Sequence, residues 1–330
     1  MRILVTGGAG FIGGHLAARF GRRGHDVTVL DTLEPFYDLG IKQRNREIAR
    51  EAAEAGGGTY EFVEGSVTDK AQINALVSEE DVDFIFHQAA QAGVRVSVEN
   101  PRKAHRINVD GTLNVLDAAR EADVRRVVHA SSSSVYGKPE YLPYDEAHPN
   151  EPVSPYGASK LAAEHYARVY HEVYGLPTVS LRYFTVYGPR MRPNMAFTNF
   201  VSRCLHGESP IIYGDGTQTR DFTYVKDVAD ANEALLESDA ADGEEVNVGS
   251  GGRITIEELA RVIRDEIDPS IEIVYEEARE GDAEHTQADV TKAAELLEYE
   301  PSVSIREGAR RFVEWYRENE EWYDPLVRRS

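Results

Sequence analysis

Two hydrophobic periodicities alternate through the first 185 residues of the chain. Short runs rich in β-branched and other apolar residues predict buried strands, and segments whose apolar residues recur every three or four positions predict amphipathic helices. The predicted strands are Ile3–Thr6, Val27–Leu30, Tyr60–Val63, Phe84–His87, Arg126–Ala130 and Thr178–Arg182. The clearest predicted helices are Phe11–Arg23, Ala104–Arg120 and Ala158–Tyr174. This alternation predicts an α/β fold with a doubly wound parallel sheet, helices on both faces and a ligand crevice at the carboxyl ends of the strands.

The alternation becomes less regular after Pro189. A loop at 188–196 precedes a predicted helix at about 197–206, a short strand near Ile211 and an amphipathic stretch at 305–322. We interpret residues 1–185 as a large domain and residues 186–330 as mainly a smaller α/β lobe over its mouth. Segments around 225–250 are expected to return to the large domain.

The composition is that of an ordinary globular protein, with 41% hydrophobic and 28% charged residues. Its apolar runs are far shorter than the ~20 residues that a membrane span needs. The chain enters a strand-like run directly after Met1 and Arg2, without an apolar leader, so we expect a soluble, cytoplasmic protein. The single cysteine, Cys204, excludes a disulfide framework and a cysteine-based zinc cluster, and no metal site is predicted.

The charge is strongly acidic. Asp and Glu number 57 against 36 Lys and Arg, which gives a net charge of −21, and only seven of those cations are lysine. A field of this sign repels nucleic acids and anionic membranes, so neither is expected as a partner. The small number of lysines and the well-spread excess of acidic residues favour a halophilic protein. In such a protein a high concentration of counterions would screen the repulsion between the acidic residues. An ordinary acidic protein is the alternative.

A glycine-rich turn joins the first predicted strand to the first predicted helix. Its residues are Gly7, Gly10, Phe11, Ile12 and Gly13, at the spacing G-x-x-G-x-x-G. Positions without a Cβ let a pyrophosphate approach the helix N-terminus. Asp31 follows eighteen residues after Gly13, where a carboxylate would bind the adenosine ribose and repel a 2′-phosphate. The pattern predicts a Rossmann-type site for NAD rather than NADP, although an acid at position 31 can also cap a helix.

Tyr156 and Lys160 lie four residues apart at the start of a predicted helix and therefore share one of its faces. A phenol, with an ordinary pKa of ~10, becomes a base at neutral pH only when positive charge stabilises the phenolate. Lys160 and a bound nicotinamide cation would each supply such charge. Taken alone, such a pair is more often a surface contact between neighbouring turns of a helix.

A run of four serines, Ser131 to Ser134, leaves the fifth predicted strand and leads into Val135, Tyr136 and Gly137. Hydroxyls at the carboxyl end of a central strand lie where sheet ligands bind. A serine-rich turn that caps a helix would look the same. The serines, the glycine turn and the Tyr-x-x-x-Lys pair together favour catalysis.

The combined motifs resemble those of the extended short-chain dehydrogenase/reductases, in the group of NAD-dependent nucleotide-sugar epimerases and dehydratases. The resemblance covers nearly the whole chain. It rests on TGGAGFIG at 6–13, HQAA at 87–90, SSSSVYG at 131–137, YGASK at 156–160, LRYFTVYGP at 181–189 and TRDFTYVKDV at 219–228.

The resemblance implies a role for each matching residue. Ser132 would bridge the sugar O4 and Tyr156, Tyr156 would be the base and acid, and Lys160 would hold the nicotinamide ribose. The further cofactor-binding residues that it implies are Ser66, Val67, Gln88, Ala89, Ala90, Asn108 and Tyr183, with Asn108 in a supporting position. The substrate-binding residues that it implies are Arg95, Ser133, Ser134, Thr185, Arg192, Asn199, Tyr213, Arg220, Arg279 and Asp282.

Two departures narrow the expected reaction. Dehydratases of this group carry Asp-Glu directly after the catalytic hydroxyl, where this chain has Ser133 and Ser134, so elimination of water is not expected. Segments 91–95 and 185–196 resemble uronate 4-epimerases, with Thr185 where glucose epimerases usually carry Asn. We expect C4 epimerisation of UDP-glucuronate and UDP-galacturonate, with Arg192 and Thr185 at the C6 carboxylate. A UDP-glucose/UDP-galactose 4-epimerase is the alternative.

Two further functions stay open, and the resemblance also implies an assembly. A 4-keto uronate is a β-keto acid, so a UDP-glucuronate decarboxylase is possible. The other alternative is a non-catalytic dinucleotide sensor, but the intact Tyr156 and Lys160 argue against it.

Members of the family that the chain resembles usually form dimers through a four-helix bundle. The surplus apolar residues that predict such a homodimer are Val109, Leu113, Leu116, Leu161 and Val169.

Overall fold

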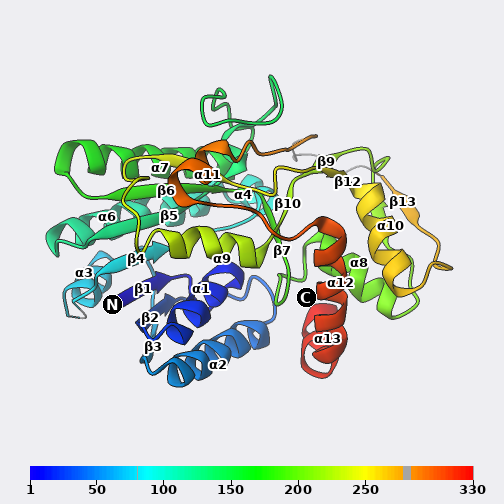
Figure 1. The fold of residues 1–330 in the computed structure, drawn as a ribbon, viewed down its shortest axis with the longest axis horizontal. Coiled ribbons are helices and arrows are strands. Elements are labelled where there is room, and N and C mark those ends of the chain that lie inside the picture. The colour runs from blue at the N-terminus through cyan, green and yellow to red at the C-terminus, as the bar shows by residue number, and fades with distance from the viewer. Residues whose placement is uncertain (80, 278–283, 330) are drawn as a thin grey trace.

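The computed structural model describes residues 1–79, 81–277 and 284–329, and a parallel sheet of seven strands forms its centre (Figure 1). The strands are β1 (Arg2–Thr6), β2 (Asp26–Asp31), β3 (Tyr60–Glu64), β4 (Phe84–His87), β5 (Arg126–Ser132), β6 (Thr178–Tyr183) and β11 (Glu245–Val248). Their spatial order is β11-β6-β5-β4-β1-β2-β3, so the direction of winding reverses between β1 and β4. The predicted doubly wound α/β fold is confirmed, and its crevice lies where β1 and β4 end.

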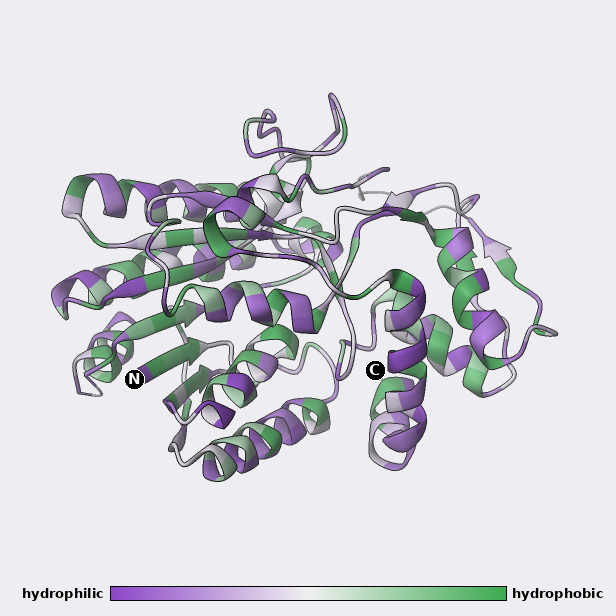
Figure 2. Cartoon of the chain, viewed as in Figure 1, coloured by the Kyte–Doolittle hydropathy of each residue, from purple (hydrophilic) through white to green (hydrophobic). Residues whose placement is uncertain are grey.

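Helices cover both faces of this sheet. One face carries α1 (Phe11–Arg22), α2 (Leu39–Gly56) and α9 (Val225–Ala234), and the other carries α3 (Lys70–Glu79), α6 (Gly111–Glu121) and α7 (Pro155–Tyr174). Successive residues of a strand point to opposite faces, so Ile3 and Val5 pack towards α1 while Leu4 packs towards α3 and α6. Figure 2 shows β1 and β4 largely in the hydrophobic colour, as strands covered on both faces require.

The predicted helix at Ala104–Arg120 is interrupted. After the short helix α4 (Val94–Glu99), the chain forms α5 (Pro101–His105), a π-helical turn η1 (Arg106–Asp110) and then α6. A π turn takes one extra residue per turn and often occurs at functional positions. Here it contains Asn108, whose side chain is only 1% exposed.

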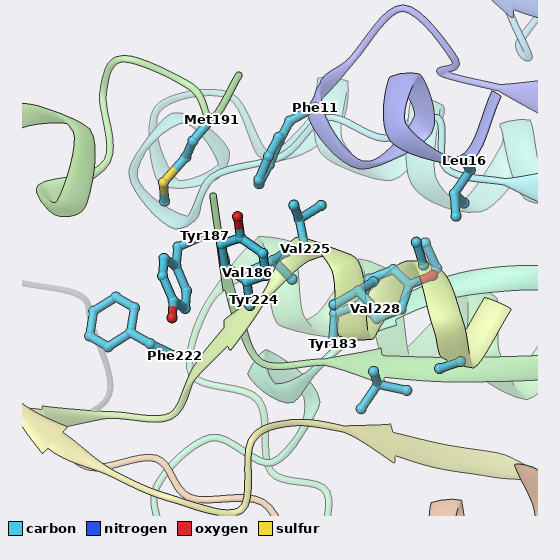
Figure 3. Packing of buried hydrophobic residues seen from close by; sticks show 14 of the residues in the cluster. Phe11, Leu16, Tyr183, Val186, Tyr187, Met191, Phe222, Tyr224, Val225 and Val228 are labelled. Atoms are coloured by element: carbon cyan, nitrogen blue, oxygen red, sulfur yellow. The ribbon is translucent and has the colours of Figure 1, made fainter. Parts of the chain in front are cut away.

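The smaller lobe consists of paired short strands and helices around an aromatic core. Its strand pairs are β7 (Thr185–Tyr187) with β10 (Phe222–Tyr224), β8 (Ile211–Tyr213) with β13 (Val274–Glu276) and β9 (Thr219–Arg220) with β12 (Ile254–Thr255). Its helices include α8 (Ala196–Leu205), α10 (Ile256–Ile267), α12 (Ile305–Glu318) and α13 (Glu320–Arg328). Tyr187 stacks on Phe197 with 4.5 Å between ring centroids, and Phe222 approaches it edge-on (Figure 3).

The predicted amphipathic stretch at 305–322 is two helices rather than one. Asn319 ends α12 and begins α13, since its Nδ2 donates to the Trp315 carbonyl and its Oδ1 accepts from Trp322 Nε1, both at 2.8 Å. Such side-chain bonds satisfy the backbone and ring groups at the junction. Within the described part of the chain, no helix is both long and apolar enough to cross a bilayer.

The large domain and the smaller lobe share one continuous buried cluster, which includes Val5 and Leu16 on one side and Phe312 and Tyr316 on the other. The second half of the chain also returns to the main sheet. β11 pairs with β6 from Glu245 opposite Ser180 onward, and α11 (Thr291–Leu297) packs on β11. The division of the chain at residue 185 stays a prediction.

Candidate active site

A cavity of about 1040 Å³ opens at the carboxyl ends of the central strands and is lined by both lobes. Most of the residues singled out in the sequence line it. They are Gly7, Gly10, Phe11, Ile12, Gly13, Asp31, Ser66, Val67, Gln88, Ala89, Ala90, Arg95, Ser132, Ser133, Ser134, Tyr156, Lys160, Tyr183, Thr185, Arg192, Asn199, Tyr213 and Arg220. Arg279 and Asp282 lie outside the described residues. The roles assigned to all these residues stay predictions, but the fold brings those that are described, Arg279 and Asp282 apart, to one cavity.

The glycine turn is packed too closely for side chains. Gly7 has a left-handed backbone, with φ +68°, and a Cβ on it would lie 2.7 Å from the Ala89 amide nitrogen. A Cβ on Gly13 would lie 2.4 Å from the Gly7 carbonyl oxygen. Helix α1 has Gly10 as its N-cap, without a side-chain cap, so the amide end of the helix is left to an anionic ligand. This geometry fits a pyrophosphate.

Asp31 ends β2 as predicted and is 7% exposed. Its Oδ1 accepts from the Leu33 amide at 2.8 Å and from Lys42 Nζ at 3.0 Å, and its Oδ2 accepts from the Ala9 amide at 3.2 Å. Lys42 also lines the cavity, and the sequence reading missed it. The contact between Lys42 and Asp31 could not be predicted from their separation in the sequence, because the conformation of the loop between β2 and α2 determines where the Lys42 amine lies. The pair offers both an acceptor and a donor to ribose hydroxyls.

Tyr156 begins α7, which Ser154 caps by accepting from the Gly157 amide at 3.1 Å. The Tyr156 amide donates to Ser97 Oγ at 3.0 Å, which fixes this first turn against α4. The Tyr156 phenol is hydrogen-bonded to Ser132. Burial raises the pKa of Tyr156, while the Ser132 hydrogen bond and the positive charge of Arg192 oppose that rise. From the sequence, Lys160 and a bound nicotinamide cation were expected to supply the opposing charge, and the contribution of Arg192 was not foreseen.

Lys160 lies one turn further along α7 and is 3% exposed. Burial lowers its pKa to about 8, and the carboxylate of Glu164 opposes this. Its Nζ donates to the Ala130 carbonyl at 2.6 Å, at the carboxyl end of β5. The amine is therefore anchored beside Ser132, in a position to meet a ligand in the cavity.

The serine run ends β5 and continues into a 3₁₀ turn, η2 (Ser133–Val135). Ser132 Oγ accepts from the Ser134 amide at 3.2 Å, which fixes its rotamer next to Tyr156. Among the described residues that line the cavity, the two carboxylates are Asp31, which ends β2, and Glu34, in the loop after it. The described wall near Tyr156 therefore lacks the acid pair that water elimination needs, in agreement with Ser133 and Ser134 at those positions.

Arg192 comes from the loop after β7 and reaches the same end of the cavity. Its guanidinium stacks over the Phe36 ring at 5.5 Å and donates to Met195 Sδ at 3.5 Å. Burial lowers the pKa of Arg192. In the described residues no carboxylate lies within ion-pair distance of it. A cation held this way is suited to an anionic group of a ligand.

Arg220 and Tyr213 line the lobe side of the cavity, and the backbone holds the arginine there. Arg220 Nη1 donates to the Thr219 carbonyl at 2.8 Å and to the Glu284 carbonyl at 3.2 Å. These two bonds fix the position of the guanidinium.

Asn108 is not among the residues that line the cavity, and its place among the cofactor-binding residues stays a prediction. Its Oδ1 accepts from the Gln91 amide at 2.7 Å, and its Nδ2 donates to Ser159 Oγ at 2.8 Å. It therefore holds the 88–91 wall of the cavity against α7. The supporting position that the resemblance implied fits this geometry.

Residues 4–312 match the protein family described as GDP-mannose 4,6 dehydratase. The chain belongs to this family. The family is part of the extended short-chain dehydrogenase/reductases, and the resemblance noted in the sequence is confirmed.

Relatives of this extended short-chain dehydrogenase/reductase match it along almost their full length. A putative UDP-glucose 4-epimerase of Methanocaldococcus jannaschii is 41% identical, covering 96% of this chain and 99% of that protein. A UDP-glucuronate 4-epimerase of Thermodesulfobacterium geofontis is 36% identical, covering 96% of each. The crystal structure of UDP-glucuronic acid 4-epimerase from Bacillus cereus, in complex with UDP-glucuronic acid and NAD, is 33% identical with a TM-score of 0.89, covering 96% of this chain and 99% of that one.

Proposed function

We propose that this protein interconverts UDP-glucuronate and UDP-galacturonate by epimerisation at C4, with NAD as its resident cofactor. The observation that carries the proposal is Arg192. Its guanidinium lies close enough to Tyr156 to act on the phenol, and no described carboxylate pairs with it. A C6 carboxylate would neutralise this cation next to the group that abstracts the O4 proton.

The residues of the cavity fit NAD. The glycine turn excludes side chains where a pyrophosphate would approach α1, and Asp31 with Lys42 faces the adenosine ribose position at the end of β2. The Asp31 carboxylate favours NAD over NADP, because it would repel a 2′-phosphate. When bound, NAD supplies the hydride acceptor and donor for C4 of the sugar.

The residues of the chain perform the proton transfer and the positioning. Tyr156 accepts the O4 proton directly or through Ser132, to which it is hydrogen-bonded. Lys160 holds the nicotinamide ribose and adds a positive charge that stabilises the phenolate. After the 4-keto sugar has turned over in the cavity and C4 has received the hydride on its other face, Tyr156 returns the proton to O4. Arg192 and Thr185 hold the C6 carboxylate throughout and so oppose loss of CO2.

The three alternatives differ in what they require of this site. A UDP-glucose 4-epimerase, the activity named for the Methanocaldococcus jannaschii relative, needs no cation at C6. A UDP-glucuronate decarboxylase would use the same cation but would release CO2 from the 4-keto acid. A non-catalytic sensor would not need Tyr156 and Lys160 poised in an open cavity.

We also propose that two copies of the chain pair through the outer face of α7. This face exposes Tyr166, Val169, Val173 and Tyr174, of which Val173 is 65% exposed. Val109 and Leu116, which the sequence suggested for the interface, are buried within the chain itself at 4% and 0% exposed, so they do not belong to this face. Contiguous exposed apolar side chains on one helix mark an interaction surface. Cytoplasmic location and adaptation to high salt stay predictions.

The deciding experiment is incubation of the purified protein with UDP-glucuronate, UDP-galacturonate, UDP-glucose and UDP-xylose, followed by mass spectrometry and proton NMR of the products. We expect UDP-glucuronate and UDP-galacturonate to interconvert without a change of mass. Loss of 44 Da would establish the decarboxylase instead. Turnover of UDP-glucose in preference to both uronates would establish the glucose epimerase, and no turnover of any sugar would favour the sensor.

A further inference from the structure

Arg190 is a buried cation without an ionic partner in the described part of the chain. Its side chain is 6% exposed, and burial lowers its pKa to about 10. Its backbone is in the left-handed region, with φ +65°, which residues with a Cβ rarely adopt. Removing a charge from water and holding a disfavoured backbone both cost stability, so compensating contacts are expected.

The hydrogen bond that Arg190 makes leads to the glycine turn. Arg190 Nη1 donates to Asn45 Oδ1 at 2.9 Å. Asn45, which is fully buried on α2, donates from Nδ2 to the Ala9 carbonyl at 2.9 Å and to the Gly10 carbonyl at 3.0 Å. The single amide group therefore joins Arg190 to the two carbonyls that precede the amide end of α1.

Two further contacts hold the backbone beside Arg190. His15 of α1 bonds the Pro189 carbonyl through Nε2 at 2.8 Å, and the Tyr323 hydroxyl of α13 donates to the Met191 carbonyl at 2.5 Å. Burial and the charge of Arg190 keep the pKa of His15 well below its usual value, so the ring is neutral and Nε2 is the donor. Met191 packs in the same buried cluster as Phe11 of the glycine turn (Figure 3).

The residues on either side of this contact serve opposite ends of the cavity. Gly10, next to Asn45, lies where the dinucleotide pyrophosphate would bind, and Arg192, two residues after Arg190, lies beside Tyr156. Arg190 and Asn45 do not line the described cavity wall themselves. The glycine turn and the Arg192 loop are therefore connected through buried groups that are hydrogen-bonded to one another.

We propose that Arg190 and Asn45 are positioning residues that tie the dinucleotide turn to the loop carrying Arg192, so that cofactor binding and placement of the sugar end depend on one another. The inference rests on the proposed function for its sugar end only. Its cofactor end is tested on the substrate-free protein.

The test measures the dissociation constant of NAD for the protein stripped of cofactor, together with the unfolding midpoint. Arg190→Met keeps most of the side-chain volume but removes the donor, and we expect NAD to bind about tenfold more weakly, equivalent to about 1.4 kcal/mol. Arg44→Met is the matched control, because Arg44 is the neighbouring cation but is 40% exposed and pairs with Glu47. It should leave NAD binding within twofold of wild type.

Asn45→Asp provides a second variant of nearly identical shape. The carboxylate still accepts from Arg190 but cannot donate to the Ala9 and Gly10 carbonyls, so NAD binding should weaken while the unfolding midpoint stays close to wild type. In a double-mutant cycle, Asn45→Ala combined with Arg190→Met should weaken NAD no more than either change alone. With UDP-glucuronate as substrate, Arg190→Met should raise KM and leave kcat at saturating NAD within about twofold, since Tyr156 and Lys160 are untouched.

The inference is overturned if Arg190→Met binds NAD within twofold of wild type. If Arg190→Met does not fold, the same result in Asn45→Asp overturns it. Additive effects of the two changes in the double-mutant cycle would also overturn it. If wild type does not turn over UDP-glucuronate, the proposed substrate is wrong, and the NAD measurements still decide the role of this pair.

Discussion

Glu164 lies one helical turn after Lys160 on α7 and is completely buried. Its carboxylate pairs with Arg182 of β6 and accepts from Ser131 Oγ at 2.6 Å, at the end of β5. Arg182 in turn donates to the Tyr136 hydroxyl at 2.9 Å. One buried charge thus joins the helix of Tyr156 and Lys160 to the two strands that form the floor of the cavity, and its negative charge favours the protonated form of Lys160.

Removing that charge should shift the pH dependence of the reaction. In Glu164→Gln the opposing influence on the pKa of Lys160 is lost, so the pKa falls further below about 8 and the ammonium is lost at lower pH. We expect the alkaline limb of the kcat/KM profile to move to lower pH. Glu172→Gln, on the exposed end of the same helix, is the control and should leave the profile unchanged. An unshifted alkaline limb in Glu164→Gln would show that Glu164 does not act on Lys160.

Lys160 itself should make stability depend on pH. Its pKa is about 8 in the folded chain against an ordinary value of 10.5, so below pH 8 the buried ammonium is charged in both states and its cost is fully present. Between pH 8 and 10.5 the unfolded chain binds the extra proton, and the free energy of unfolding rises with pH. Lys160→Met should abolish this rise, which amounts to about 3 kcal/mol at most.

Urea unfolding of wild type, Lys160→Met and the exposed control Lys226→Met at several pH values measures this difference. Parallel curves for wild type and Lys160→Met would contradict the prediction.

Tyr156→Phe should retain the fold and cofactor binding but lose turnover by several orders of magnitude, because the variant lacks the phenol that takes the O4 proton. Tyr166→Phe, an exposed tyrosine of the same helix, should keep full activity. The measurement is kcat for both variants with NAD content determined in parallel. More than a tenth of wild-type activity in Tyr156→Phe would exclude the mechanism.

Arg192→Ala should discriminate between the uronate and the glucose substrates. A C6 carboxylate left without its cation in a partly closed site should cost about 2–4 kcal/mol of binding. The loss should fall on UDP-glucuronate and spare UDP-glucose, which has no charge at C6. Thr185→Val should act in the same direction with a smaller effect, since only one hydroxyl is lost. Equal changes in kcat/KM for both sugars would remove the reason to prefer the uronate.

The proposed assembly predicts a dimer that one charge can disrupt. Val173→Glu places a carboxylate on the exposed apolar face of α7, and burial of that charge between two copies should favour monomers. Val274→Glu, at a 40% exposed position on β13, is the control and should leave the dimer intact. Light scattering at high salt measures the mass of both variants. A monomeric wild-type protein would refute the assembly.

The sequence predicted those features that short segments encode. The glycine turn needs its spacing because a Cβ at Gly7 or Gly13 meets backbone within 3 Å, and a helix alone places Tyr156 and Lys160 on one face. Six of the seven strands of the sheet were predicted nearly to their ends, most of them because a strand buried on both faces must be apolar throughout. The seventh, β11, was expected only as part of a segment that returns to the large domain. The prediction of one continuous helix at 104–120 was wrong for the same reason. The extra residue of the π turn leaves the local hydrophobic pattern almost unchanged, so the pattern does not show the interruption.

Contacts between distant segments could not be predicted in this way. Lys42 reaches Asp31 only because α2 packs on α1, and Arg190 bonds Asn45 across 145 residues of chain. An apolar stripe shows that a helix face is covered but not what covers it. In the sequence, Val109 and Leu116 could therefore not be distinguished from Val169. Only the packing of the folded chain shows that the first two are buried and the third is exposed. The sequence by itself determined the fold class, the dinucleotide turn and the reacting pair. The tertiary structure alone decided which charges lie buried beside them, because burial depends on elements that meet only when the whole chain has folded.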